Sequence, residues 1–221
     1  MPDFNKLNLA DYTSNKEVLD KAKATMVNAE NGFGFYAEPK SKSETHHLLL
    51  NLQALSCAPV DRKTYTTVHE FVHMINTCSF APTENLEYTI TDQEEYLGFG
   101  FADEFLACLY GLQFCNSKGL TCHDSVFDLS ADRFVRAVNS RLCQQTDFAD
   151  GFIQNLYTLL AYVTFFEQTK GIYILADILP QASLEAKKEL LGKLMKNKVG
   201  EIDKSNLQEI PRLAWKLWES I

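Results

Sequence analysis

The sequence predicts an α+β fold that is mostly helical, with a small N-terminal sheet. Two observations predict the helical part: apolar residues recur at helical spacing through most of the 221 residues, and polar capping residues stand before several of these segments. A third predicts the sheet, because the short apolar centre of residues 45–55, THHLLLNLQAL, favours a strand. The chain is long enough to bury one sizeable core.

The N-terminal segment begins with a helix over residues 14–28, for which Ser14 or Asn15 is the expected cap. The sequence NGFGF at 31–35 ends this helix, because glycine favours turns over helix interiors. The strand at 45–55 follows.

A second helix is predicted over residues 61–77, with Asp61 as its cap. One side of it forms an apolar stripe that we expect to be buried, made of Val68, Phe71, Val72 and Ile75. The adjoining row contains Tyr65, His69, His73 and Asn76. The two histidines are therefore expected to border the core.

The sequence TDQE at 91–94 has the form of a capping box and predicts a third helix that ends near Asn116, before Lys118 and Gly119. From about residue 128 the pattern is almost entirely helical, and the predicted helices are 130–143, 147–169, 183–197 and 204–220. We expect a core region at 1–125 and a helical C-terminal region at 126–221 that packs on it as one compact domain.

Charge and composition exclude several classes of function. The net charge of −8 argues against a nucleic-acid or anionic-membrane surface, since both need clustered Lys and Arg. The N-terminus has no basic segment followed by an apolar run, so no signal peptide is expected. None of the six cysteines forms a CxxC pair, and we expect reduced thiols and a cytoplasmic protein.

The stretch TTVHEFVHMINTC, residues 66–78, contains the candidate metal-binding and catalytic residues. His69, Glu70 and His73 match the HExxH pattern of zinc enzymes. Residues four apart lie on one face of a helix, so the two imidazoles can converge on one ion. Glu70 is turned about a quarter of the way round the helix, which is a suitable place for a general base beside the metal.

A catalytic zinc site needs three protein ligands and one open position. We prefer Glu104, in the third helix, as the third ligand. Small residues lie beside it on the helix and favour the close approach of another helix: Gly100, Ala107, Cys108 and Gly111. Asp103 and Glu95 are the alternatives, although Asp103 points elsewhere and Glu95 lies in the first turn, where acids are favoured anyway.

The segment from His46 to Asn76 resembles the strand, loop and HExxH helix of zincin metallopeptidases. With Glu104-Phe105-Leu106-Ala107 downstream, it is most similar to gluzincins, and nearest to ImmA/IrrE-like peptidases. That family usually has glycine where this chain has Val72. The resemblance covers about residues 46–111 and implies a zincin-like core.

The resemblance implies a zinc-dependent endopeptidase that acts on a protein or peptide substrate. Glu70 would take a proton from the attacking water and deliver it to the departing amine. The strand at 45–55 would pair with an extended substrate. The candidates for the oxyanion donor are Tyr88, Tyr96, Tyr110 and His123.

A second hypothesis is a non-catalytic zincin-like protein used for binding or regulation, with structural or absent zinc. The bacterial families that the chain resembles act in stress regulation, in phage control or as secreted toxins. A bacterial effector delivered to a host cytosol without a cleavable signal peptide fits the same sequence features as a resident cytoplasmic enzyme.

Overall fold

The computed structural model describes residues 34–37, 47–50, 52–81, 86–121, 135, 138, 149–180 and 182–220. Within these ranges the chain is mostly helical, as the sequence predicts. In chain order the elements are β1 (Gly34–Ala37), β2 (His47–Leu50), α2 (Leu52–Cys57), α3 (Val60–Phe80), α4 (Leu86–Thr89), α5 (Gln93–Ser117), α7 (Ala149–Lys170), α8 (Leu184–Leu194), the 3-10 helix η3 (Lys204–Asn206) and α9 (Glu209–Glu219).

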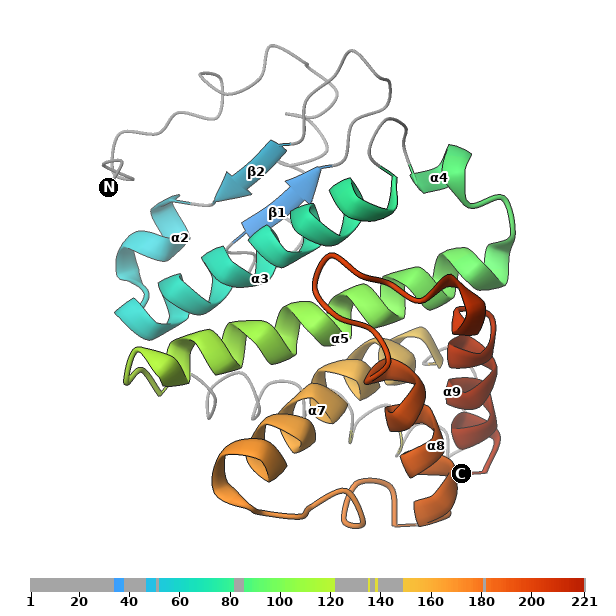
Figure 1. The fold of residues 1–221 in the computed structure, drawn as a ribbon. Coiled ribbons are helices and arrows are strands. Elements are labelled where there is room, and N and C mark those ends of the chain that lie inside the picture. The colour runs from blue at the N-terminus through green and yellow to red at the C-terminus, as the bar shows by residue number, and fades with distance from the viewer. Residues whose placement is uncertain are drawn as a thin grey trace.

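Helix α5 is the centre of the arrangement. Helix α3 packs along one side of it, and α7 and α9 pack against it on the other, while the two strands lie over the outer side of α3 (Figure 1). The strands pair antiparallel, with Gly34 opposite Leu50 and Ala37 opposite His47. Helix α8 packs against α9.

The sequence of α5 explains its central position. Its buried residues occur on all sides of the helix, from Gly98 to Cys115, which is typical of a helix surrounded by others. The helix begins after Asp92, whose side chain accepts a hydrogen bond from the backbone N–H of Glu95, so the cap is Asp92 and not the predicted Thr91. Its end matches the prediction.

Helix α3 buries a different side from the one predicted. Val72 is buried, but Phe71 is 47% exposed, and Val68 and Ile75 are only partly buried. The polar row is the more deeply packed one, and its Asn76 is fully buried. The reason is that this row faces α5, where its polar groups find hydrogen-bond partners, so burial does not leave them unsatisfied.

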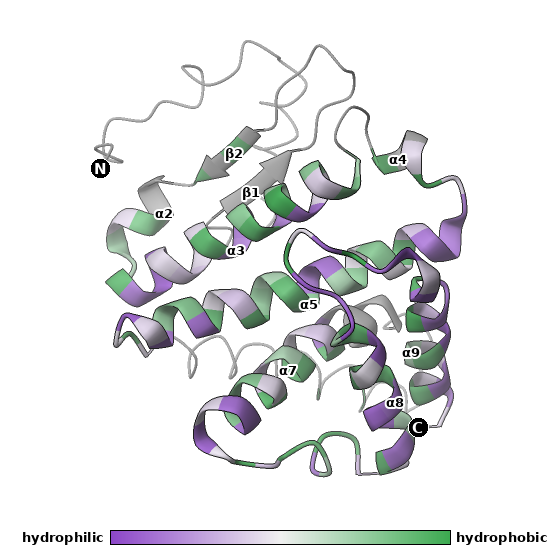
Figure 2. Cartoon of the chain, in the orientation of Figure 1, coloured by the Kyte–Doolittle hydropathy of each residue, from purple (hydrophilic) through white to green (hydrophobic). Residues whose placement is uncertain are grey.

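The hydrophobic core joins both halves of the chain. It contains residues of α3, α5, α7, α8 and α9. The apolar run of α7, residues 156–165, is buried except for the partly exposed Thr158, as its sequence predicts. Hydrophobic and hydrophilic residues alternate along α9 in Figure 2, as expected of a helix with one buried side.

Other expectations are corrected or fall outside the described residues. The strand predicted at 45–55 is shorter, because the chain turns into helix α2 from Leu52, and β1 was not predicted. The described parts of the chain contain no other strand. The predicted helix at 14–28 and the boundary near 125 lie outside those parts, and of the helix predicted at 130–143 only Val135 and Val138 are described, both as helical. No described helix has the length and apolar character needed to cross a membrane.

Candidate metal centre

Helix α3 brings the two histidines of the HExxH motif together. The Nε2 atoms of His69 and His73 lie 3.0 Å apart, and the two rings meet edge to face. Each side chain is 15% exposed. This follows from the four-residue spacing, which places both side chains on one face of the helix, one turn apart.

Glu104 reaches the same point from α5. One carboxylate oxygen, Oε1, lies 3.7 Å from Nε2 of His69, and the other, Oε2, lies 3.5 Å from Nε2 of His73. Among the described residues, these three form the group whose ligand atoms all lie within 4.8 Å of one another. The structure thus brings together the three ligands that the sequence predicts.

The donor set fits a zinc ion. Ligand atoms bound tetrahedrally at about 2.0–2.1 Å lie about 3.3 Å from one another. The two Nε2 atoms are 3.0 Å apart, and each lies close to this distance from a Glu104 oxygen, 3.7 Å from Oε1 for His69 and 3.5 Å from Oε2 for His73. One ligand atom from each of the three residues lies within 4.8 Å of the other two. Two imidazole nitrogens and one carboxylate oxygen leave the fourth position of a tetrahedral ion free.

Of the two glycines among the predicted small residues, Gly111 and not Gly100 lies at the contact between α3 and α5. A Cβ at Gly111 would lie 3.0 Å from two ring carbons of Tyr65, so the tyrosine packs where a side chain would stand. Gly100 has no atom within 4 Å of such a Cβ and is exposed, so it does not contribute to the helix contact.

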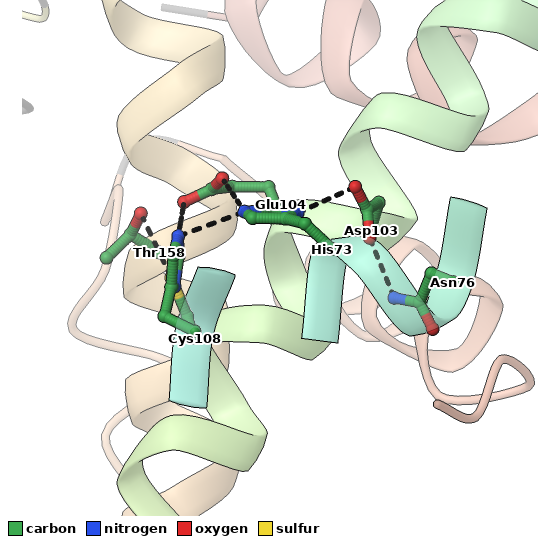
Figure 3. A network of polar contacts seen from close by, with 7 residues as sticks. His73, Asn76, Asp103, Glu104, Cys108 and Thr158 are labelled. Atoms are coloured by element: carbon green, nitrogen blue, oxygen red, sulfur yellow. Dashed lines mark hydrogen bonds and ion pairs between the residues drawn. The ribbon is translucent and has the colours of Figure 1, made fainter. Parts of the chain in front are cut away.

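The two alternatives for the third ligand occupy other places. Asp103 is on the far side of His73, where its Oδ2 lies 2.7 Å from Nδ1 of the ring (Figure 3). Glu95 is in the first turn of α5, and its Oε1 accepts a hydrogen bond from Gln208 of the C-terminal segment. Neither belongs to the three-ligand group.

Asp103 has a second partner that the sequence did not predict. Its Oδ1 accepts a hydrogen bond of 2.7 Å from Nδ2 of Asn76, one turn after His73 on α3 (Figure 3). Metal-binding histidines commonly donate their second ring nitrogen to a carboxylate, which holds the ring in place. The position of Asn76 in the histidine row is the sequence signal for this contact.

Cys108 contacts the other side of the cluster. Its Sγ lies 3.8 Å from Nδ1 of His69, 3.4 Å from Oε1 of Glu104 and 3.8 Å from the hydroxyl of Thr158 on α7 (Figure 3). Sequence reasoning treated Cys108 as a small neighbour of Glu104. Its chemical contacts arise only when α3, α5 and α7 pack together.

The charges of the cluster stabilise one another. Burial by itself raises the pKa of Glu104, but the two histidines outweigh it and lower that pKa to about 2. Burial lowers the pKa of His73, yet the carboxylates of Asp103 and Glu104 outweigh it and hold this pKa well above its usual value. Burial and the nearby Glu104 raise the pKa of the Cys108 thiol. A metal ion must therefore displace a proton from this site in order to bind.

The structure describes only some of the residues predicted to act on the substrate. Glu70 follows His69 on α3 and is partly buried. Of the candidates for the oxyanion donor, Tyr96 and Tyr110 are exposed on α5, whereas the side chain of Tyr88 and all of His123 lie outside the described residues. The donor stays a prediction.

Comparison with models of protein families, with curated proteins and with solved structures finds no significant match for this chain. The inference of function therefore depends on the HExxH motif and on the geometry of the cluster.

Proposed function

We propose that this protein is a zinc-dependent endopeptidase with a zincin-like core of the gluzincin type. The observation that carries the proposal is the convergence of His69 Nε2, His73 Nε2 and a Glu104 carboxylate oxygen from two packed helices. Two histidines and one glutamate form a common ligand set of catalytic zinc sites in peptidases.

The chain's own residues have separate tasks in this proposal. His69, His73 and Glu104 hold the ion, and zinc, when bound, polarises the scissile carbonyl and makes water acidic enough to act at neutral pH. Glu70 takes one proton from the water that attacks the carbonyl carbon. When the carbon–nitrogen bond breaks, Glu70 gives this proton to the departing amine.

The proposed substrate is a peptide segment of another protein, bound in the cytosol of the producing cell or of a host. In the described residues β2 pairs with β1 alone, so its second edge is the place where an extended substrate backbone would add as a further strand. The helical C-terminal half of the chain and the connection at 80–90 would choose the cleavage site.

The test separates binding of zinc from cleavage. Glu70→Gln should keep about one equivalent of zinc and lose about 10²- to 10⁴-fold in cleavage rate, because the amide cannot accept the proton. Glu95→Gln, an acid outside the cluster, is the matched control and should cleave like the wild type. Substrates are found by comparing new protein N-termini produced by the wild type and by Glu70→Gln.

Two results would count against the proposal. Undiminished cleavage by Glu70→Gln would refute the role of the glutamate. The second result is a folded wild-type protein that takes up no zinc and whose metal content does not change when His69 is replaced by alanine. It would favour the non-catalytic binding or regulatory protein instead.

A further inference from the structure

A chain of hydrogen bonds connects the candidate metal centre to the C-terminal part of the protein. Nδ1 of His73 lies 2.7 Å from Asp103, and Asp103 accepts a hydrogen bond from Nδ2 of Asn76. The Oδ1 of Asn76 accepts a hydrogen bond of 2.8 Å from the backbone N–H of Gly200. Asn76 is fully buried, and both ends of its amide have partners.

The order of donors and acceptors along this chain has one solution. A backbone N–H can only donate, so the carbonyl oxygen of Asn76 must face Gly200, and its amino group must face Asp103. The Asp103 carboxylate can only accept, so Nδ1 of His73 must carry a hydrogen. In a neutral His73 the free electron pair then belongs to Nε2, the atom that faces His69 and Glu104.

The series of hydrogen bonds begins at Gly200, in a turn that several other hydrogen bonds hold in place. The side chain of Asn197 donates to the carbonyls of Lys193 and Leu194 and accepts from the backbone N–H of Asp203. Gly200 has a φ of +79°, a conformation that favours glycine. These contacts fix the direction in which the Gly200 N–H points.

We propose that Asn76 and Asp103 are positioning residues of the metal centre, and that the turn at 197–203 is part of that centre although it provides no ligand. The turn orients Asn76, Asn76 orients Asp103, and Asp103 holds His73 with Nε2 turned toward the ion. This inference rests on the proposed zinc site, but it does not depend on peptidase activity.

The test exchanges the two side chains of the pair. Asn76→Asp places two buried carboxylates against each other, and Asp103→Asn places an amide between two donors. The double exchange restores a complete chain, because residue 76 again accepts from Gly200 and residue 103 again accepts from His73. We expect each single change to weaken zinc binding by about 10- to 100-fold, and the double exchange to recover most of that loss.

The measurements are zinc affinity, by competition with a chelating indicator, and the visible spectrum of the cobalt-substituted protein. Thermal unfolding of each metal-free variant reports its stability separately. Lys187→Met is the stability control: Lys187 is also buried, and its ammonium donates to the backbone carbonyls of Ala176, Ile178 and Leu179, none of which belongs to the hydrogen bonds that link Gly200 to His73. It should lower the unfolding temperature and leave zinc affinity and the cobalt spectrum unchanged.

The outcomes are distinguishable. Suppose that the wild type binds zinc tightly. The inference is wrong, while the proposed function stands, if the single variants bind zinc equally tightly. The same holds if the double exchange binds zinc no better than Asp103→Asn does. If the wild type binds neither zinc nor cobalt, the proposed function and this inference both fail. If Asn76→Asp does not fold, comparison of Asp103→Asn with the double exchange still decides.

Discussion

Replacing Glu104 by glutamine should destabilise the metal-free protein by an amount that depends on pH. The pKa of Glu104 is lowered from 4.5 to about 2 in the folded state, against the effect of burial, by the positive charges of His69 and His73. At about 1.36 kcal/mol per pKa unit, this corresponds to an upper limit of about 3 kcal/mol. The side chain is 34% exposed, so screening by solvent reduces the expected value to about 1–2 kcal/mol.

The sign of the pH dependence follows from the direction of the shift. A carboxylate whose folded-state pKa is lowered contributes its stability above the unfolded value of 4.5 and loses it as the pH falls through about 2. Glu104→Gln should therefore cost the most at about pH 5.5, where His73, whose pKa is raised, is also protonated, and about half as much at about pH 3.

The assay is urea unfolding of wild type and Glu104→Gln at these two pH values, with a chelator present to remove metal. Glu189→Gln, an exposed acid on α8, controls for the loss of one negative charge and should have almost no effect. An equal cost at both pH values would refute the reasoning, because the loss would then not come from the ionised carboxylate. So would the absence of any cost at about pH 5.5.

Further predictions concern the packing around the site, and each is measured by urea unfolding. Gly98→Ala should cost about 1–3 kcal/mol, since a Cβ would lie 1.9 Å from the carbonyl oxygen of Leu207; Gly100→Ala, with open space around it, should instead gain up to about 1 kcal/mol. A Gly98→Ala protein as stable as the wild type would contradict the close contact between Gly98 and Leu207. Lys187→Met should cost about 1–3 kcal/mol, because the buried ammonium donates to three backbone carbonyls of the preceding turn, whereas exposed Lys188→Met should be nearly neutral. Equal effects of the two lysine changes would contradict this role.

The candidate ligands were predictable because their spacing has a local cause. His69 and His73 share a helix face through the four-residue spacing alone, which needs no knowledge of the rest of the fold. Glu104 was a harder choice. Its small neighbours indicated a helix contact, and Ala107 and Gly111 are indeed buried, but Gly100 is exposed and does not take part.

The errors arose where side chains from different elements compete for the same space. Hydropathy predicted that Phe71 is buried, yet it is 47% exposed, while the polar Asn76 is fully buried. An apolar pattern shows which residues prefer burial but not which polar residues will find partners inside. Asn76 finds its partners in Asp103 and Gly200, and these depend on how α5 and the C-terminal turn pack against α3.

The sequence by itself determined that the chain is mostly helical and that two imidazoles stand one turn apart on one helix, because backbone geometry and neighbouring residues decide both. Tertiary packing decided which acid joins them. Asp103 and Glu104 are adjacent in the chain, but about 100° of helix rotation separates their side chains. One therefore lies beside Nδ1 of His73 and the other beside Nε2, and this difference depends on how α5 is rotated against α3.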